Sequence, residues 1–479
     1  MPRRPDRLAE PPVRLDRSAS TPLTAQLSDA LREAMSTGTL RAGERLPSSR
    51  SLATQLGVSR TVVTDAYQQL YAEGWLDGRH GSGTFVTEHE PLPGSGTPRD
   101  PVAPRGTGAG AVWERPSRAQ LRRSGTVDLR PGAPWVHDHD RAALRRAWRH
   151  AAEHPPSDDP DPRGLPRLRA LLAEHLRRTR GVRVGPENIL VTRGTGNGLD
   201  LVGAMVRPTA GPGVRAGVED PGYGKARTIL AARGAEIVPC PVDGDGIRPE
   251  DLPDDLSLVY TTPAHQYPLG GRLPLPRRER LLAWARRTGA VVVEDDYDAE
   301  FRYDVAPLPA LYGLDPGRVV LLGTLSKTLD PDLGIGWIVA EPDLMHRIVD
   351  IRAGLSDRTS GPVQAATALL LERGDLDRHL RRMRLEYARR RALLVEHLGP
   401  RLSGDTAGLH VLLSLPEAAV APVIAAAAEE GVLVEDTSRT SHGAPRVHGL
   451  VIGYGSADRT ELRRACGVLA RAVQRHTGE

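Results

Sequence analysis

Residues 319–327 read Val319-Val-Leu-Leu-Gly-Thr-Leu-Ser-Lys327, an apolar run followed by a lysine among small hydroxyl residues. The apolar run predicts a buried strand, and the lysine comes just after its end. A lysine in such a place can form an imine with an aldehyde cofactor, and Thr324 and Ser326 are then available to a phosphate group. The stretch therefore predicts an α/β fold with amine chemistry at a strand end.

Lysine is rare in this chain. Of the 64 basic residues only Lys225 and Lys327 are lysines, and all the others are arginines. An arginine cannot lose its proton to form an imine, so a lysine in such a background indicates amine chemistry. The alternative is a composition bias that leaves two surface lysines, and for Lys225 the sequence favours neither interpretation.

Upstream, a second apolar run, Val291-Val-Val, leads into Glu294-Asp-Asp-Tyr-Asp298. A carboxylate at the end of a buried strand can keep a pyridinium nitrogen protonated, and Tyr297 can hydrogen-bond the phenolic oxygen of the same ring. A solvated strand end is the alternative, but the position about 30 residues before the lysine motif makes the cofactor interpretation the stronger one.

Two glycine-rich segments fit the same hypothesis. Thr192-Arg-Gly-Thr-Gly-Asn-Gly198 lies between a strand and a helix that is expected near Leu199, where backbone amides cradle phosphates. Glu219-Asp-Pro-Gly-Tyr223 places an aromatic ring after a sharp turn, where it can stack on a cofactor or remain on a surface turn. Apolar runs at 189–192, 256–260, 290–293 and 319–322 alternate with helical stretches and predict a mostly parallel sheet with a smaller C-terminal lobe.

Residues 14–88 predict a separate unit of short helices and a hairpin. A helix follows Thr21-Pro22, a second runs from Ser48 to Gly57, and Ser59 caps a third that ends near Gly74. The tight turn at 56–59 is typical of a helix-turn-helix. Residues 75–86 predict a wing. In the third helix the inward residues are expected to be Val62, Ala66, Tyr67 and Leu70.

The opposite face of the third helix carries Arg60, Thr61, Thr64, Asp65 and Gln68, a polar surface suited to a DNA major groove. Net charge is only +4, and residues 21–85 contain six arginines and six acidic residues, so bulk charge does not indicate DNA. A small helical interaction module with solvated arginines is the alternative.

Composition limits the remaining possibilities. Residues 89–125, rich in proline and glycine, predict a flexible linker, and residues 126–479 form the large domain. Cys240 and Cys466 cannot supply a disulfide framework or a four-ligand zinc site, and no metal site is expected. No apolar run is long enough for a transmembrane helix or a secretory signal, so we expect a cytoplasmic protein with no membrane partner.

The first unit closely resembles a known family. Gly43-Glu-Arg-Leu-Pro-Ser-Ser-Arg50, Leu56-Gly-Val-Ser-Arg60 and Gly81-Ser-Gly-Thr-Phe-Val86 match the winged helix-turn-helix of GntR-type transcription regulators. The resemblance implies contacts with double-stranded operator DNA. Together with the outward positions it gives these expected DNA-binding residues: Arg45, Ser49, Arg50, Ser59, Arg60, Thr61, Thr64, Arg79, His80 and Gly81.

The rest of the chain resembles fold-type I aminotransferases, which use pyridoxal phosphate, and the whole chain resembles the MocR subfamily of GntR regulators. The matching segments begin at Thr262, Glu294, Gly323 and His379. The resemblance implies a Schiff base at Lys327, and it also implies a homodimer. Further cofactor contacts follow by analogy: Asp295 with the pyridine nitrogen, Tyr297 with the ring oxygen, Tyr223 stacked on the ring, Thr195, Gly196, Thr324 and Ser326 at the phosphate, and Tyr267 where aminotransferases usually have asparagine.

Two positions depart from the family pattern. Gly334 stands where the family usually has an arginine that pairs with the cofactor phosphate, and glycine cannot replace its charged fork. Asp159 stands where related proteins tend to have a tyrosine that reaches the partner's phosphate. Both changes are expected to weaken cofactor binding.

The sequence thus predicts a transcription regulator whose aminotransferase-like domain senses a small amine or amino acid at Lys327. One alternative is a working aminotransferase with a DNA-binding appendage, for which Arg439 and Arg446 are candidate partners of a substrate carboxylate. Another is a regulator of the same architecture that no longer binds pyridoxal phosphate, which Gly334 and Asp159 favour.

Overall fold

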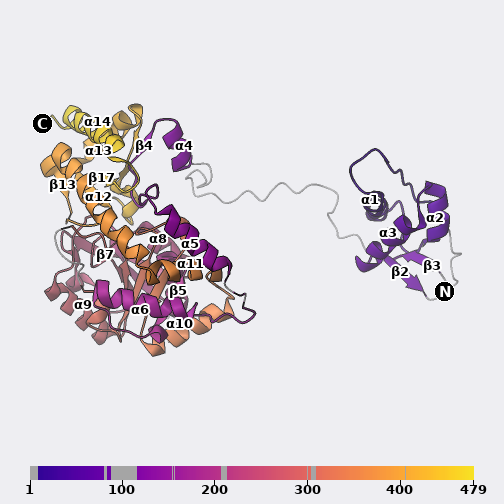
Figure 1. The fold of residues 1–479 in the computed structure, drawn as a ribbon, viewed down its shortest axis with the longest axis horizontal. Helices are drawn as coiled ribbons and strands as arrows, with labels where there is room; N and C mark the ends of the chain where they lie inside the picture. Colours follow the sequence, from indigo (N-terminus) through magenta and orange to yellow (C-terminus); the bar gives the residue numbers. More distant parts are fainter. Residues whose placement is uncertain are drawn as a thin grey trace. The chain divides into compact units, whose positions relative to one another are not determined.

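The chain divides into two units, Met1–Ala111 and Val112–Glu479, in a computed structural model (Figure 1). The structure describes residues 9–79, 83–87, 116–153, 155, 157–206, 213–298, 300–303, 309–404 and 406–478. Among these residues, no helix combines the length and apolar character that a bilayer span requires.

The first unit is a helix-turn-helix with a small antiparallel sheet in the order β1-β3-β2. Ser48 and Ser59 cap α2 and α3 by accepting hydrogen bonds from Ser51 and Val62, and Gly57 ends α2 in the left-handed conformation with φ of 63°. The predicted helices and wing strands are therefore present. Their bounds are α1 Leu23–Ser36, β1 Arg45–Leu46, α2 Ser49–Leu56, α3 Arg60–Ala72, β2 Leu76–Arg79 and β3 Gly83–Val86.

One helix face differs from the prediction by a single residue. Val63, rather than Val62, is fully buried on α3, together with Ala66, Tyr67 and Leu70, and Val62 is half-buried. A shift of one residue turns a helical side chain by about 100°. The outward residues Arg60, Thr61, Asp65 and Gln68 are exposed as expected, whereas Thr64 is half-buried.

The second unit is built on one eight-stranded sheet in the order β5-β12-β11-β10-β9-β6-β7-β8. Strands β11, β10, β9, β6 and β7 are parallel, and β12 runs antiparallel to both of its neighbours. The mostly parallel sheet is thereby confirmed. Its strands are β5 Ile189–Thr192, β6 Arg215–Asp220, β7 Glu236–Asp243, β8 Gly246–Ile247, β9 Leu258–Thr261, β10 Val291–Asp296, β11 Val319–Thr324 and β12 Gly336–Val339.

Alternate residues of the central strands enter two separate cores. Val292, Val319 and Leu321 pack on one side, and Val293 and Leu322 pack on the other. Burial on both faces explains why these strands are continuous apolar runs. The covering helices are α5 Arg141–Ala152, α6 Pro166–Arg180, α9 Leu275–Thr288 and α11 Gly361–Glu372 on the first side, and α7 Thr195–Met205, α8 Gly224–Ala232 and α10 Pro342–Gly354 on the second.

A smaller lobe follows at the C-terminal end, where Figure 1 shows α13, α14 and β17 gathered at one end of the large unit. It has a four-stranded sheet in the order β13-β14-β17-β16, and a separate parallel pair, β15 with β4. Its elements are α12 Asp375–Leu398, β13 Leu402–Ser403, β14 His410–Ser414, α13 Glu417–Glu429, β15 Val432–Leu433, β16 Glu435–Asp436, β17 Gly449–Gly453 and α14 Arg459–Thr477, with β4 at Val127–Asp128.

Two local expectations need correction. The helix expected near Leu199 begins at Thr195, so the glycine-rich turn itself forms the first turn of α7. Within the stretch expected to be a linker, residues 118–123 form α4 (Arg118–Arg123), which a Ser117–Gln120 capping box begins. Arg118 donates to the carbonyls of Asp128 and Arg130, so this part of the stretch belongs to the large unit. Residues 88–115 lie outside the described residues.

Candidate functional site

The large unit contains a cavity of about 630 Å³ at the carboxyl ends of the parallel strands β6, β9 and β10. Such strand ends are the usual ligand site of an α/β sheet. Six residues named from the sequence line it: Thr195, Tyr223, Tyr267, Asp295, Tyr297 and Lys327. Lys225, the other lysine of the chain, lines the same cavity.

Lys327 follows β11 and its side chain is half-buried. Its Nζ donates a hydrogen bond to the carbonyl oxygen of Gly132. Burial, together with the positive charge of Lys225, lowers the pKa of Lys327 to about 8. A sizeable fraction of this amine is therefore neutral near physiological pH, and a neutral amine is the form that attacks an aldehyde.

Asp295 lies at the end of β10, where it is 4% exposed. Its Oδ2 accepts a hydrogen bond from the Tyr260 hydroxyl at 2.5 Å, whereas its Oδ1 has no partner of full hydrogen-bond geometry among the described residues. The Thr195 side chain also favours the ionised carboxyl. Burial raises the pKa of Asp295 to about 7, against the opposing effects of Tyr260 and Lys327. A cationic nitrogen placed at Oδ1 would restore the ionised form.

The residues predicted to bind phosphate are also brought together. Gly194 is the N-cap of α7 with φ of 109°, and a Cβ there would lie 3.6 Å from Thr324 Oγ1 and 3.8 Å from Ser326 Oγ. The two hydroxyls thus lie beside the N-terminus of α7, whose first turn contains Thr195 and Gly196. A helix N-terminus with adjacent hydroxyls is suited to binding an anion.

The two departures from the family pattern differ in their surroundings. Gly334 has φ of 55°, and nothing lies within 4 Å of a Cβ built on it. The next residue, Ile335, accepts a hydrogen bond from Thr324 Oγ1, so Gly334 is adjacent to the phosphate-site residues. Asp159 is exposed.

Three tyrosines form an aromatic wall of the cavity. The Tyr223 ring is stacked on Tyr260 with centroids 6.5 Å apart, and it meets Tyr267 edge-on at 6.2 Å. Burial raises the pKa of Tyr223 to about 12, so its hydroxyl stays neutral. The stacking position predicted for Tyr223 therefore borders the cavity, and Tyr267 stands beside it.

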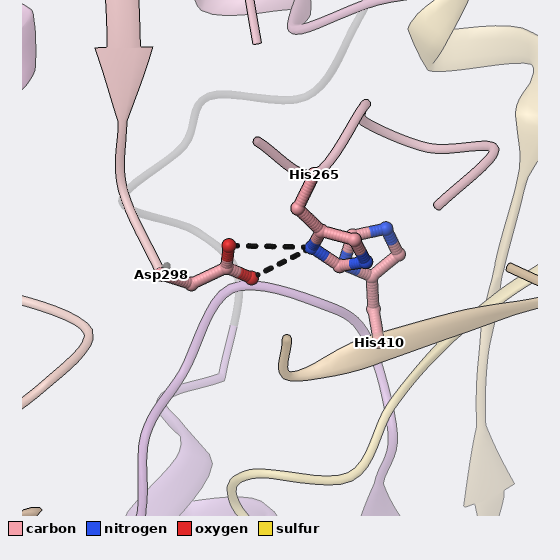
Figure 2. A group of neighbouring side chains, drawn as sticks. All are labelled: His265, Asp298 and His410. Atoms are coloured by element: carbon pink, nitrogen blue, oxygen red, sulfur yellow. Dashed lines mark hydrogen bonds and ion pairs between the residues drawn. The ribbon is translucent and has the colours of Figure 1, made fainter. Parts of the chain in front are cut away.

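His265, Asp298 and His410 form a buried cluster (Figure 2), and His265 contacts Tyr297. His265 Nδ1 lies 3.0 Å from Asp298 Oδ2, and the Tyr297 hydroxyl donates to the His265 carbonyl at 3.0 Å. Burial lowers the pKa of His410 well below its usual value, so this ring is neutral. The ligand-type atoms of the three lie within 4.8 Å of one another, but the His265–Asp298 contact is that of a hydrogen-bonded pair, which fixes the chain around Tyr297.

Several residues that line the cavity were not predicted from the sequence. Tyr260 belongs to a predicted strand, and only the pairing of β9 with β10 shows that it reaches Asp295. His410 and Leu409 come from the C-terminal lobe. Of the two arginines considered for a substrate carboxylate, Arg439 lines the cavity and Arg446 does not.

The first unit presents its own candidate site, a groove of about 340 Å³ between β1, α2, α3 and the wing. Arg45, Ser49 and Thr64, all predicted to contact DNA, line it together with Gln68 and Thr84. Gly83 has a φ of 114°, a conformation that residues with a side chain rarely adopt, so glycine is favoured at this position. The groove combines hydroxyl, amide and guanidinium groups, which are the groups that contact phosphates and bases.

The remaining predicted DNA contacts divide into three groups. Arg50, Arg60 and Thr61 are exposed, and Arg60 Nε donates to Ser49 Oγ at 3.4 Å. The Ser59 hydroxyl caps α3. Arg79 ends β2; its side chain, and the residues His80 and Gly81, lie outside the described part of the chain.

Comparison with known families agrees with this division. Residues 23–86 match the family described as bacterial regulatory proteins, gntR family. Residues 136–465 match the family described as aminotransferase class I and II. Each family match falls within one of the two structural units.

Relatives that combine both parts are similar over nearly the whole chain. The HTH-type pyridoxine biosynthesis transcriptional regulator PdxR of Corynebacterium glutamicum is 37% identical, over 97% of this chain and 99% of its own length. The probable rhizopine catabolism regulatory protein MocR of Rhizobium meliloti is 36% identical, over 96% of this chain and 95% of its own length.

Among solved structures, the α-aminoadipate aminotransferase LysN of Thermus thermophilus, complexed with N-(5'-phosphopyridoxyl)-L-leucine, is similar to this chain. It superimposes with a TM-score of 0.66 at 26% identity, over 75% of this chain and 96% of the other. With full-length similarity to regulators and aminotransferase similarity confined to the large unit, the chain belongs to the MocR-type GntR transcription regulators, in which a GntR helix-turn-helix is joined to an aminotransferase-like domain.

Proposed function

We propose that the large unit holds pyridoxal phosphate at Lys327 and senses a small amine or amino acid. The GntR unit then carries the response to double-stranded operator DNA, in the cytoplasm. The observation that supports this most is the shared cavity of Lys327 and Asp295, since an amine of lowered pKa there faces a buried carboxylate with one unpartnered oxygen.

The residues present fit pyridoxal phosphate. When bound, this cofactor supplies an aldehyde that bonds reversibly to a primary amine. Lys327 is that amine, and Asp295 Oδ1 pairs with the ring nitrogen, which removes the cost of leaving the oxygen unpartnered. Tyr223 covers one face of the ring. The Tyr297 hydroxyl, which here donates to the His265 carbonyl, would turn to donate to the ring oxygen.

The phosphate is held by Thr324 and Ser326, Thr195 and Gly196, with Tyr267 beside the ring. Hydroxyls and helix amides supply hydrogen bonds here, but Gly334 supplies no charge. Binding is therefore weaker than in relatives with an arginine, yet the helix N-terminus still favours an anion.

The effector enters with its amine toward Lys327 and its carboxylate toward Arg439. The Arg439 guanidinium lies 3.5 Å from Glu435 Oε1 and is 54% exposed, so a ligand carboxylate can reach it. Because the effector binds two states of the unit with different affinity, it shifts the population of the DNA-binding state. The acting form is a homodimer, which places two DNA-binding units on one operator.

A mass-mapping experiment tests the cofactor assignment. Full-length protein is mixed with pyridoxal phosphate, reduced with borohydride and digested, and the peptide that carries the pyridoxyl group is identified. Because the chain has only two lysines, the label can lie on Lys225, on Lys327 or on the N-terminal amine. We expect the label on Lys327; a label confined to Lys225 or absent from both lysines contradicts the proposal.

The DNA assignment has its own test. Arg60→Ala is expected to weaken operator binding by about tenfold or more, because it removes a charged contact from the exposed face of α3. Arg41→Ala, at an exposed arginine outside the predicted contact set, serves as the matched control. Unchanged affinity of Arg60→Ala in a folded protein would remove α3 from the recognition role.

A further inference from the structure

The second lysine of the cavity has no task in the cofactor site described above. We infer that Lys225 binds a second acidic group of the effector, so that the effector is a dicarboxylic amino acid. The inference rests on the proposed sensing function and adds the class of ligand to it. Both lysines of a chain with 64 basic residues line this one cavity, a coincidence that composition bias does not explain.

Lys225 has no counter-charge among the residues that the structure describes. It is exposed, and no hydrogen bond or ion pair joins it to any of the described residues. The acidic residues of the cavity are engaged elsewhere: Asp295 with Tyr260, Asp298 with His265, and Glu435 with Arg439. Arg227, the neighbouring cation, donates to three backbone carbonyls, those of Arg439, Thr440 and Ser441. Lys225 is thus the unpaired cation of this cavity in the described part of the chain.

The backbone around Lys225 adds to the positive potential. Lys225 is the second residue of α8, and Tyr223, the N-cap, makes no side-chain capping hydrogen bond. A cation in the first turn of a helix faces the positive end of the helix dipole, which is unfavourable unless an anion lies nearby. Lys327 adds a further positive charge within electrostatic range. An anionic group of a ligand would compensate all three contributions.

Arg439 lies next to the same helix terminus. A Cβ on Gly224, the residue before Lys225, would come within 2.8 Å of the Arg439 carbonyl oxygen. Arg227 links α8 to the turn at Thr437–Thr440 through its carbonyl contacts. The cavity therefore has two cationic side chains, Lys225 and Arg439, on adjoining segments, whereas Lys327 is more buried than Lys225.

The positions of Lys225 and Arg439 favour a ligand with two acidic groups over a ligand with one. A monocarboxylic amino acid has one carboxylate, which Arg439 would bind, and one amine, which would replace the Lys327 amine on the cofactor aldehyde. Lys225 would then have no partner. Aspartate, glutamate and their longer homologues supply the missing group. A side-chain amide of the same shape has no charge to offer and gains much less from a lysine.

The experiment compares acid and amide pairs by calorimetry on the full-length protein loaded with pyridoxal phosphate. L-glutamate is measured against L-glutamine, and L-aspartate against L-asparagine, with wild type, Lys225→Met, Lys225→Arg and Arg475→Met. Arg475 is an exposed cation on α14 and serves as the control for a general loss of charge. O-phosphoserine against serine forms a third pair, which separates carboxylate from phosphate recognition.

We expect wild type to bind the acid of the better-fitting pair about tenfold or more tightly than its amide, because a charged contact is lost in the amide. Lys225→Met should reduce that preference to less than about twofold, whereas Lys225→Arg and Arg475→Met should keep it. A preference that survives Lys225→Met, its absence in wild type, or no binding of either acid overturns the inference. A preference confined to phosphoserine overturns the carboxylate assignment.

The absorption spectrum of each sample shows whether a failure concerns the role of Lys225 or the proposed cofactor site. A cofactor band with no acid preference contradicts the role of Lys225 alone. An acid preference without a cofactor band in the same protein contradicts the cofactor assignment and leaves Lys225 as an anion-binding residue.

Discussion

The ring-binding and phosphate-binding parts of the candidate site differ in the groups that they offer to a ligand. The ring side has a buried carboxylate with an unpartnered oxygen, a tyrosine wall, and a lysine of lowered pKa. The phosphate side has hydroxyls and a helix N-terminus, but Gly334 leaves it without the usual arginine. From this difference we expect cofactor binding in this chain to depend mainly on the ring and the amine, and less on the phosphate.

The largest effect is expected from removing the charge on the ring side. Asp295→Asn should weaken binding of pyridoxal phosphate by about 10–100-fold, because a buried charged hydrogen bond contributes about 1.5–3 kcal/mol. The apparent Kd from an absorbance titration measures this. Asp332→Asn, at an exposed carboxylate that follows Lys327 in the sequence, should leave the Kd unchanged. Equal Kd values for Asp295→Asn and wild type would contradict the assignment of the ring nitrogen.

Supplying the missing charge on the phosphate side should have the opposite effect. Gly334→Arg is expected to tighten binding of pyridoxal phosphate by about tenfold, since it adds one charge-assisted contact. No atom within 4 Å obstructs a Cβ there, although the φ of 55° imposes strain. Gly334→Ala carries the same backbone strain without the charge, and the two variants are compared by their Kd. If both bind equally, the guanidinium does not reach the phosphate.

A smaller change is expected at the ring oxygen. Tyr297→Phe removes one neutral hydroxyl, so the Kd for pyridoxal phosphate should rise by about two- to tenfold. The stability of the folded protein should change little, because the variant loses only the hydrogen bond to the His265 carbonyl. Asp298 still holds the His265 ring. Thermal unfolding of the cofactor-free variant checks this point. A large loss of stability would instead give Tyr297 a structural role.

The smallest effect concerns pH. Since the pKa of Lys327 is lowered to about 8, the rate of cofactor attachment should rise with pH through about 8 and then level off. Lys225→Met removes a positive charge that contributes to this lowering, so its midpoint should move upward. Stopped-flow absorbance at a series of pH values gives both midpoints. A wild-type rate still rising steeply toward pH 10 would contradict the lowered pKa.

Sequence patterns predicted the parts of the site that lie on single segments. Lys327, Thr324 and Ser326 follow one apolar run, and the caps Ser48 and Ser59 mark helix starts. Other parts depend on contacts between distant segments. Tyr260 reaches Asp295 across neighbouring strands, and His410 enters from the C-terminal lobe, so neither role is visible in local spacing.

Two misjudged details have local causes. The sequence predicts the start of α7 several residues after its true start, because the glycines within 194–198 favour a turn over a helix. Val62 and Val63 are both apolar, and only packing selects which of them enters the core. Lys225 stood out in the sequence by its rarity, yet its place in the cavity required the fold.

An absorbance titration of full-length protein with pyridoxal phosphate, run with wild type, Lys327→Ala and Lys225→Arg, shows whether Lys327 holds the cofactor. We expect a saturable near-visible band in wild type and in Lys225→Arg that is absent from Lys327→Ala. A band that persists in Lys327→Ala, or its absence from wild type, would contradict the claim that Lys327 holds the cofactor.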